Sequence, residues 1–196
     1  MSGMNSDFKF KVIAGKFKGK VLALSDKTVT RSTKGITRES VFNTLQGEVI
    51  GSFFVEVFGG SGTIGIEAIS RGASEVVFLE KDKNSYETIK ANLAALGVQN
   101  GKVFNVDSFD FFDDILGTLP TDKRKIFYFD PPFDIREGMA GIYEKCIKLV
   151  EKIKPMPLDI VIFEHMTTFV PNDKISNFYL VKTKKFGKTS ISYYAL

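Results

Sequence analysis

The 196-residue chain contains very few of the side chains that build disulfides and metal centres. It has one cysteine, Cys146, and one histidine, His165. A single cysteine excludes an internal disulfide, and one cysteine with one histidine cannot assemble a His/Cys zinc cluster. The sequence therefore predicts a protein without a bound metal, in a reducing, cytoplasmic setting.

Long apolar segments are also missing. No apolar run approaches the length that crosses a bilayer, and residues 1–10 lack the apolar core of a signal peptide. With 43% hydrophobic residues, the chain can nonetheless bury a substantial core, and its length suits one domain with a short appendage. We expect a monomer that makes no membrane contact.

The net charge of +4 is unevenly distributed along the chain. Residues 1–40 contain nine lysines and arginines but only three acids, so this segment carries +6 and the remainder −2. Such a run is usually a solvated surface, but its segregation into one segment, interleaved with Phe and Val, favours contact with a polyanion. The predicted RNA-binding residues are Lys16, Lys18, Lys20, Arg31 and Arg38.

The basic segment has the pattern of a β-hairpin followed by a helix. Residues 8–13 and 16–24 alternate apolar and basic side chains around the turn signal Ala14-Gly15. Residues 33–45 have apolar side chains at helical spacing, with Gly47 as the stop. We therefore assign residues 1–45 to an RNA-contacting appendage and residues 46–196 to a larger domain.

In the larger domain, short apolar runs alternate with helical patterns. This order predicts a doubly wound α/β sheet, and a closing hairpin makes its last strand antiparallel. The predicted strands cover residues 53–58, 75–80, 102–106, 126–129, 158–163, 178–186 and 189–196. Helices are predicted from the glycine-rich loop after the first strand to Arg71, and over 84–96, 109–116 and 137–153.

A glycine-rich loop follows the first of these strands. Gly60, Gly62 and Gly65 form G-x-G-x-x-G between strand and helix, where glycine allows a ligand to approach the backbone and the helix N-terminus offers N–H groups. Glu80 lies twenty residues after Gly60, at the end of the next strand, which is the spacing at which an acid binds ribose hydroxyls. Together they predict a nucleoside-cofactor site; the alternative is a helix cap and a surface glutamate.

Asp107 and Ser108 follow the third strand. Asp107 either caps the helix over 109–116 or accepts a hydrogen bond from an adenine amino group, and the sequence leaves both interpretations open. With these two residues, the predicted cofactor-binding set is Phe58, Gly59, Gly60, Gly62, Glu80, Asp107 and Ser108.

The fourth strand ends in Asp130-Pro131-Pro132-Phe133. Two consecutive prolines stop both strand and helix and hold the backbone extended, at the sheet edge where open α/β sheets bind ligands. The Asp130 carboxylate and the Pro131 carbonyl can accept the two N–H bonds of an aromatic amine, and Phe133 can stack on its ring. Alternatively, Asp130 caps a turn and Phe133 belongs to the core.

This layout is that of S-adenosylmethionine-dependent methyltransferases, and its first two strands also fit an NAD-dependent dehydrogenase. A dehydrogenase needs a nicotinamide pocket and a proton-relay group, for which the sequence offers only His165. We interpret His165 as a polar loop residue and Cys146 as a small apolar residue of a helix.

The motifs resemble those of the RsmD family, bacterial methyltransferases of a guanine N2 amine in 16S ribosomal RNA. The similarity runs through R-S-T-K-G-I-T-R-E-S-V-F-N-T-L at 31–45, V-F-G-G-S-G-T-I-G-I-E-A-I-S-R-G-A at 57–73, the ledge at 130–133 and the hairpin at 186–188. It implies a Rossmann-like class I fold, S-adenosylmethionine as cofactor, and 16S ribosomal RNA as partner, alone or within the assembling small ribosomal subunit. Asp130, Pro131, Pro132 and Phe133 would form the catalytic set.

The chain departs from the family in its first basic segment. The usual R-P-T-x-D-R-V-R-E is changed by Ser32, Gly35 and Ile36. The 130–133 motif alone would also suit an adenine-N6 enzyme, so guanine is indicated by the N-terminal segment. An adenine-N6 or other nucleic-acid amine methyltransferase and a non-catalytic RNA-binding protein with the same fold remain as alternatives.

Overall fold

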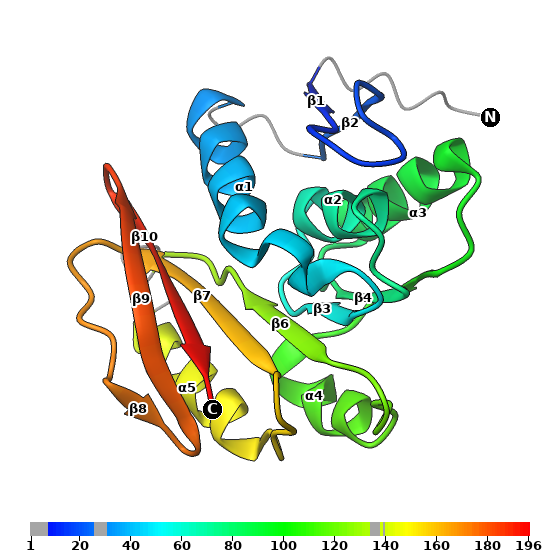
Figure 1. The fold of residues 1–196 in the computed structure, drawn as a ribbon. Helices are drawn as coiled ribbons and strands as arrows, with labels where there is room; N and C mark the ends of the chain where they lie inside the picture. Colours follow the sequence, from blue (N-terminus) through cyan, green and yellow to red (C-terminus); the bar gives the residue numbers. More distant parts are fainter. Residues whose placement is uncertain (1–7, 26–30, 134–137, 139) are drawn as a thin grey trace.

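The computed structural model describes residues 8–25, 31–133, 138 and 140–196. Within these residues, a small two-stranded sheet precedes an eight-stranded sheet that has helices on both faces (Figure 1). The doubly wound α/β architecture predicted from the sequence is confirmed.

The N-terminal hairpin forms, with shorter strands than the alternation predicts. Strand β1 (Lys9–Lys11) pairs antiparallel with β2 (Val21–Ala23). The chain between them bends into turns, and the Lys16 amide donates to Ser70 O at 2.7 Å instead of extending a strand. Phe10 is buried between two exposed lysines, so the hairpin has one apolar and one basic face.

The large sheet has the order β5-β4-β3-β6-β7-β10-β9-β8. Its first five strands in this order are parallel, and β10 lies antiparallel between β7 and β9, as expected for the last strand. The short strand β8 was not predicted, because its two residues are too few for any periodicity. The strands are β3 (Phe53–Glu56), β4 (Glu75–Leu79), β5 (Gly101–Phe104), β6 (Lys125–Phe129), β7 (Ile160–Met166), β8 (Lys174–Ile175), β9 (Phe178–Phe186) and β10 (Thr189–Ala195).

The helices separate into two layers. Helices α1, α2 and α3 cover one face of the sheet, and α4 and α5 cover the other (Figure 1). A short 3₁₀ helix, η1, extends α1. Helices were correctly predicted in all five places, although α5 begins five residues later than expected. Their bounds are α1 (Arg31–Leu45), η1 (Gln46–Val49), α2 (Thr63–Ser70), α3 (Lys83–Leu96), α4 (Ser108–Leu116) and α5 (Ile142–Lys152).

The molecule has two apolar cores, one on each face of the large sheet, and alternate side chains of the central strands belong to each in turn. In β6, Ile126 and Tyr128 face the first helix layer, whereas Phe127 and Phe129 face the second. All five residues of β6 are buried, which explains why the four residues after Lys125 form an uninterrupted apolar run. The N-terminal hairpin adds Phe10 to the first core, so the hairpin and the larger domain share one apolar interior.

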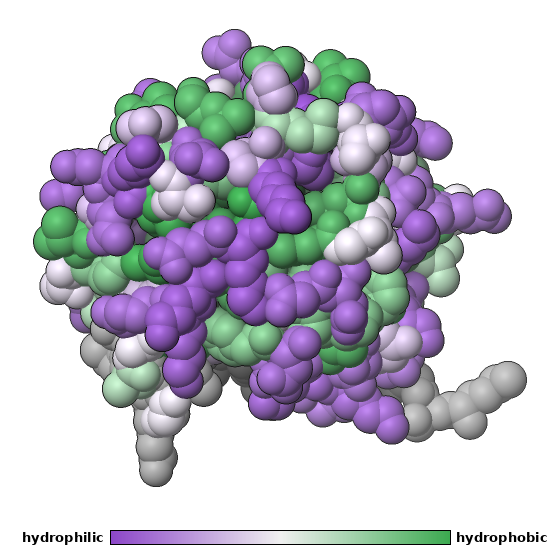
Figure 2. All heavy atoms as spheres, turned by 90° about the horizontal axis from the view of Figure 1, so that it is seen from below, coloured by the Kyte–Doolittle hydropathy of each residue, from purple (hydrophilic) through white to green (hydrophobic). Residues whose placement is uncertain are grey.

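Among the described residues, no helix is both long and apolar enough to cross a membrane. Hydrophilic side chains cover much of the face seen in Figure 2, with hydrophobic residues interspersed among them.

Candidate active site

Three acidic residues mark the carboxyl ends of neighbouring parallel strands. Glu56 ends β3, Glu80 follows β4 and Asp130 follows β6. Strand β3 lies between the other two, so the three carboxylates gather at one edge of the sheet. The negative charges of Asp130 and Glu80 both act on Glu56. This edge therefore brings the predicted cofactor and amine sites together.

The glycine loop begins where β3 ends. The Gly59 amide donates to Leu79 O at 2.8 Å, which ties the loop to the end of β4. Gly62 takes a φ of +71° as it starts α2, a conformation that favours glycine. A Cβ at Gly65 would overlap the Phe78 ring, so glycine here allows α2 to pack closely on the sheet. Gly62 and Gly65 of the predicted motif thus each have a local reason for their place.

Glu80 reaches back to this loop. One carboxylate oxygen accepts a hydrogen bond from the Gly60 amide at 2.5 Å, and the other accepts one from the Asp82 amide at 2.6 Å. Burial raises the pKa of Glu80, although both hydrogen bonds oppose the shift. The carboxylate and the loop are therefore adjacent, as the twenty-residue spacing predicts.

Asp107 caps α4, as one of the two interpretations requires. Its carboxylate accepts from the Phe109 amide at 3.0 Å and pairs with Lys81 Nζ at 2.7 Å. Burial opposes ionisation, but the hydrogen bonds from Lys81 and Phe109 outweigh it and lower the pKa of Asp107. Ser108 is buried and donates its hydroxyl to Val57 O. Both side chains thus have structural partners beside the glycine loop.

The 130–133 segment leaves β6 without entering a helix or another strand. Pro131 is buried, while Asp130, Pro132 and Phe133 are partly exposed. Neither core cluster of the described residues contains Phe133. This partial exposure agrees better with a stacking surface than with a core position.

Glu56 was missed by the sequence analysis. It is 3% exposed and accepts a hydrogen bond from the Gly65 amide at 2.9 Å. Burial is the main reason that its pKa rises to about 8, and the charges of Asp130 and Glu80 add to the shift. The only sequence signal was an acid among the apolar residues of a strand that enters the glycine loop.

A second buried acid lies on β7, two strands away from Glu56. Tyr128 of β6 donates its hydroxyl to Glu164 of β7, and both side chains are buried. Burial, reinforced by the Glu164 carboxylate, raises the pKa of Tyr128 well above its ordinary value. This pair links β6 and β7 close to the point where the 130–133 segment leaves the sheet.

His165 was wrongly interpreted as a loop residue. It lies in β7, is 1% exposed, and places Nδ1 2.8 Å from Met166 O and Nε2 2.9 Å from Ser192 Oγ. Burial lowers its pKa, so the ring is neutral; because a carbonyl only accepts, the proton is on Nδ1. Both ring nitrogens are therefore engaged in hydrogen bonds within the sheet.

The predicted RNA-binding residues have different surroundings. Lys16, Lys18 and Lys20 are exposed around the hairpin turn. Arg38 instead is 5% exposed, donates to Lys11 O at 2.9 Å, and lies 3.6 Å from the Glu67 carboxylate. The prediction of an RNA contact at Arg38 is therefore corrected, because its guanidinium binds inside the protein. The side chain of Arg31 lies outside the described residues.

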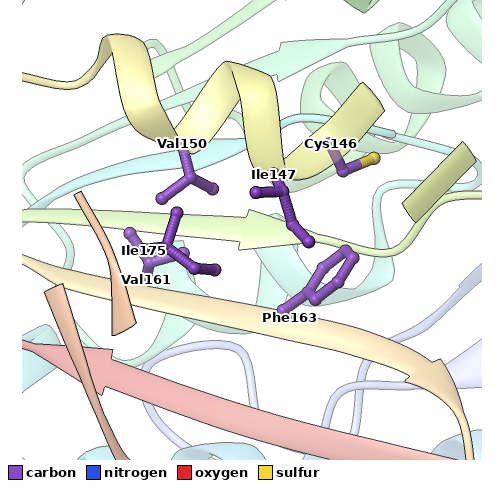
Figure 3. Close-up of a pocket in the computed structure, with 6 residues that line it drawn as sticks. All are labelled: Cys146, Ile147, Val150, Val161, Phe163 and Ile175. Carbon is purple, nitrogen blue, oxygen red and sulfur yellow. The ribbon is translucent and has the colours of Figure 1, made fainter. Parts of the chain in front are cut away.

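An apolar junction between α5, β7 and β8 also resembles a pocket. Its side chains converge from the three elements, but it contains no space for a water molecule and no polar lining (Figure 3). Cys146 lies here, fully buried, as expected of a small apolar residue. No group of three or more His, Cys, Asp or Glu side chains within the described part of the chain could hold a metal ion.

Comparison with known proteins identifies the family. A family model described as conserved hypothetical protein 95 matches residues 10–195. Ribosomal RNA small subunit methyltransferase D from Escherichia coli is 31% identical over 143 residues, which cover 73% of this chain and 67% of that protein. The chain belongs to the RsmD family. The resemblance inferred from its motifs is confirmed.

Other members of the RsmD family match over almost their full length. Ribosomal RNA small subunit methyltransferase D from Haemophilus influenzae is 29% identical over 192 residues, which cover 97% of this chain and 95% of that protein. The solved structure of a putative methyltransferase from Escherichia coli superposes with a TM-score of 0.75 at 26% identity, covering 96% of this chain and 98% of that one. The Rossmann-like methyltransferase fold is therefore confirmed for the whole described sheet.

Proposed function

We propose that this RsmD-family protein transfers a methyl group from S-adenosylmethionine to the N2 amine of a guanine in 16S ribosomal RNA. Its relatives are named as ribosomal RNA small subunit methyltransferases, which supports the reaction class and the substrate. The observation that carries the proposal is the meeting of the glycine loop, Glu80 and Asp130 at one edge of the sheet.

The cofactor fits the residues present at the ends of β3 and β4. A Cβ added at Gly60 would meet no atom within 4 Å, so the backbone of the loop is open to a ligand on this side. Glu80, next to the loop, would hold the ribose diol, and Asp107 with Ser108 would border the adenine beside Phe58. When bound, S-adenosylmethionine supplies an electrophilic methyl group.

The amine would be held at the end of β6. Asp130 and the Pro131 carbonyl accept both N2 hydrogens, which turns the nitrogen lone pair out of the guanine ring system and towards the methyl group. Transfer would break the bond between the methyl group and the cofactor's sulfur, which keeps the electron pair, and the proton released from N2 would pass to Asp130 or to water. Alignment of this kind can supply about 7–11 kcal/mol of the barrier reduction.

Phe133 would compensate for extruding the base. Unstacking a nucleotide costs a few kcal/mol, and stacking on an aromatic ring returns about 1–3 kcal/mol per base. The partial exposure of Phe133 supports this role, because a stacking ring must be open on one face.

The RNA backbone would follow basic residues from the edge of the site to the N-terminal hairpin. Lys16, Lys18 and Lys20 are exposed on the N-terminal hairpin. Lys188 lies at the tip of the β9–β10 hairpin, where its carbonyl accepts from the Thr167 amide at 2.9 Å just after β7. That contact holds the tip at the same sheet edge as Asp130, so Lys188 would meet a phosphate near an extruded guanine, and the hairpin lysines, beside the C-terminal end of α2, would meet phosphates farther along the RNA. We infer a monomer acting in the cytoplasm on this RNA, alone or in the assembling small subunit.

A methyl-transfer assay with tritiated S-adenosylmethionine on small-subunit RNA and on small subunits tests the proposal. Digestion of the product should give N2-methylguanosine; N6-methyladenosine would indicate the adenine alternative, and no transfer would indicate a non-catalytic RNA-binding protein. A melting temperature raised by NAD instead of S-adenosylmethionine would indicate a dehydrogenase.

The assignment of Asp130 has a separate test. Asp130→Ala should abolish turnover and leave S-adenosylmethionine binding nearly intact, whereas Glu80→Ala should weaken that binding. Calorimetry that shows Asp130→Ala losing cofactor affinity as severely as Glu80→Ala would remove Asp130 from the amine site.

A further inference from the structure

The N-terminal hairpin is docked across α2 by its backbone. The Ile13 and Ala14 amides donate to the two carboxylate oxygens of Glu67 at 2.8 and 2.9 Å. The Lys16 amide donates to Ser70 O, and a Cβ at Gly15 would overlap that same carbonyl. The hairpin turn therefore lies directly on the C-terminal half of the helix that starts at the glycine loop.

Two arginines complete this contact. Glu67 is fully buried, and Arg71 Nε donates to it at 2.8 Å. Arg38 from α1 approaches the same carboxylate and also binds Lys11 O of the hairpin. One buried acid thus connects the hairpin, α1 and α2, and the hairpin has a fixed position relative to α2.

The same segment touches the cofactor loop at its other end. The Ser25 amide donates to Ser61 Oγ at 3.0 Å, and the two serine hydroxyls are 2.9 Å apart. Ser85 of α3 donates its hydroxyl to Ser25 Oγ, also at 2.9 Å. Ser61 is the residue between Gly60 and Gly62, so the residue that follows the hairpin is bonded to the centre of the glycine loop.

A contact from outside can hold the glycine loop in one conformation. Gly60 and Gly62 both have positive φ, at +51° and +71°. Glycine has the largest conformational freedom of any residue, so a loop with three of them, Gly59 included, loses much entropy when it takes a single shape. Among the loop residues from Gly59 to Gly62, Ser61 alone carries a side chain through which a neighbour can hold that shape.

We propose that Ser25 is a positioning residue for the cofactor, which makes the N-terminal hairpin a structural part of the S-adenosylmethionine site as well as an RNA contact. This inference rests on the proposed function, since it assigns S-adenosylmethionine to the glycine loop. It also changes the predicted division of the chain at residue 45: residues 46–196 would carry the cofactor loop without the serine that holds it.

The test compares three single variants of the full chain. Ser25→Ala removes the hydroxyl, Ser25→Thr keeps it, and Ser74→Ala is a matched control, because Ser74 Oγ donates to Ser52 O away from the loop. Ser25→Ala keeps the amide bond to Ser61 Oγ but loses the hydroxyl's hydrogen bonds to Ser61 and Ser85. The loss of the hydroxyl bond to the loop predicts a Kd for S-adenosylmethionine raised about 2- to 10-fold. The Kd for RNA and the kcat at saturating cofactor should stay at the wild-type values, and the other two variants should bind the cofactor like the wild type.

A local measurement separates positioning from general destabilisation. Hydrogen exchange at the amides of residues 59–62 should speed up in Ser25→Ala, while exchange in β6 and β7 stays unchanged. An unchanged Kd in Ser25→Ala, or an equal rise in Ser25→Thr or Ser74→Ala, would overturn the inference. A wild-type protein that binds no S-adenosylmethionine would instead refute the proposed function itself.

Discussion

The proposed cofactor half of the site, at the ends of β3 and β4, is held by contacts from distant parts of the chain, whereas the proposed amine half after β6 relies on local backbone stiffness. Ser25 reaches the glycine loop across 36 residues, and Ile13 reaches Glu67 across 54. The amine half has two consecutive prolines instead. A loop of glycines needs support from outside, while prolines limit their own backbone.

This difference decides how mutations should act. Changes in the supports of the cofactor half should alter stability or cofactor affinity. Changes in the amine half should alter RNA affinity or turnover and leave the fold intact.

The largest effect on stability is expected at Glu67. Glu67→Gln removes the charge that the two arginines share inside the protein, and breaking a buried ion pair from one side costs about 3–5 kcal/mol. Urea unfolding measures the loss. Glu75→Gln is the control, because Glu75 pairs with Lys102 near the surface and such pairs contribute about 0–1 kcal/mol. Equal losses in the two variants would contradict the idea that Glu67 fixes the hairpin.

Phe133→Ala should have the next largest effect, confined to the amine half. Losing base stacking should weaken RNA binding by about 1–3 kcal/mol, while S-adenosylmethionine affinity and the unfolding midpoint stay near wild type. Filter binding gives the first quantity, and calorimetry with urea unfolding gives the others. A large fall in stability would return Phe133 to the core and end its role in stacking.

Glu56 should make stability depend on pH. Its pKa rises from 4.5 to about 8 on folding, so the folded state holds a proton that the unfolded state releases between these values. The stabilisation is complete below pH 4.5 and is lost as the pH rises to about 8, with a slope of at most ~1.4 kcal/mol per pH unit.

Glu56→Gln should remove that component, because the amide does not titrate. Urea unfolding at several values between pH 5 and 8 would show a flatter profile for the variant. Parallel profiles for the two proteins would mean that the carboxyl group of Glu56 is ionised in the folded state.

The smallest effect per residue is expected at the hairpin lysines. Replacing Lys16, Lys18 and Lys20 together by alanine should lower the slope of log K against log salt for RNA binding by about 2–3, since each phosphate contact contributes roughly 0.7–0.9. The fold and the cofactor affinity should be unaffected.

A second triple variant controls for the loss of positive charge alone. Lys148, Lys152 and Lys154 lie along α5 and just after it, on the opposite face of the sheet from the hairpin. Their replacement by alanine should leave the salt slope nearly unchanged. The same decrease in both triple variants would show that RNA responds to net charge instead of to the hairpin.

Sequence periodicity predicted most of the fold, because the buried strands read as apolar runs and glycines mark the loops. It could not separate Arg38 from the lysines, since one-dimensional charge counting does not show that Arg38 meets Glu67 across 29 residues of sequence. For Asp107 the simpler of the two interpretations, a helix cap, was correct, because capping depends only on residues adjacent in the sequence. His165 was misplaced because β7 continues three residues beyond its apolar run.

The candidate site was likewise predictable only where it depends on local sequence patterns. The glycine loop, Glu80 and the 130–133 segment could be proposed as site residues from the sequence because each is a local pattern. Glu56 and the Ser25–Ser61 contact were missed, since a lone acid in a strand and two ordinary serines acquire meaning only when the chain folds.

The outer edge of β9 has a consequence for how molecules of this protein meet. Strand β8 pairs only with Phe178 and Tyr179, so within the described residues the stretch from Val181 to Phe186 has no neighbouring strand on that side. Lys182 and Lys185 are exposed along it. If the β9 edges of two molecules paired through backbone hydrogen bonds, their lysines would lie close together and repel each other. The lysines should therefore prevent copies of the protein from joining sheet to sheet at the high concentrations that favour aggregation.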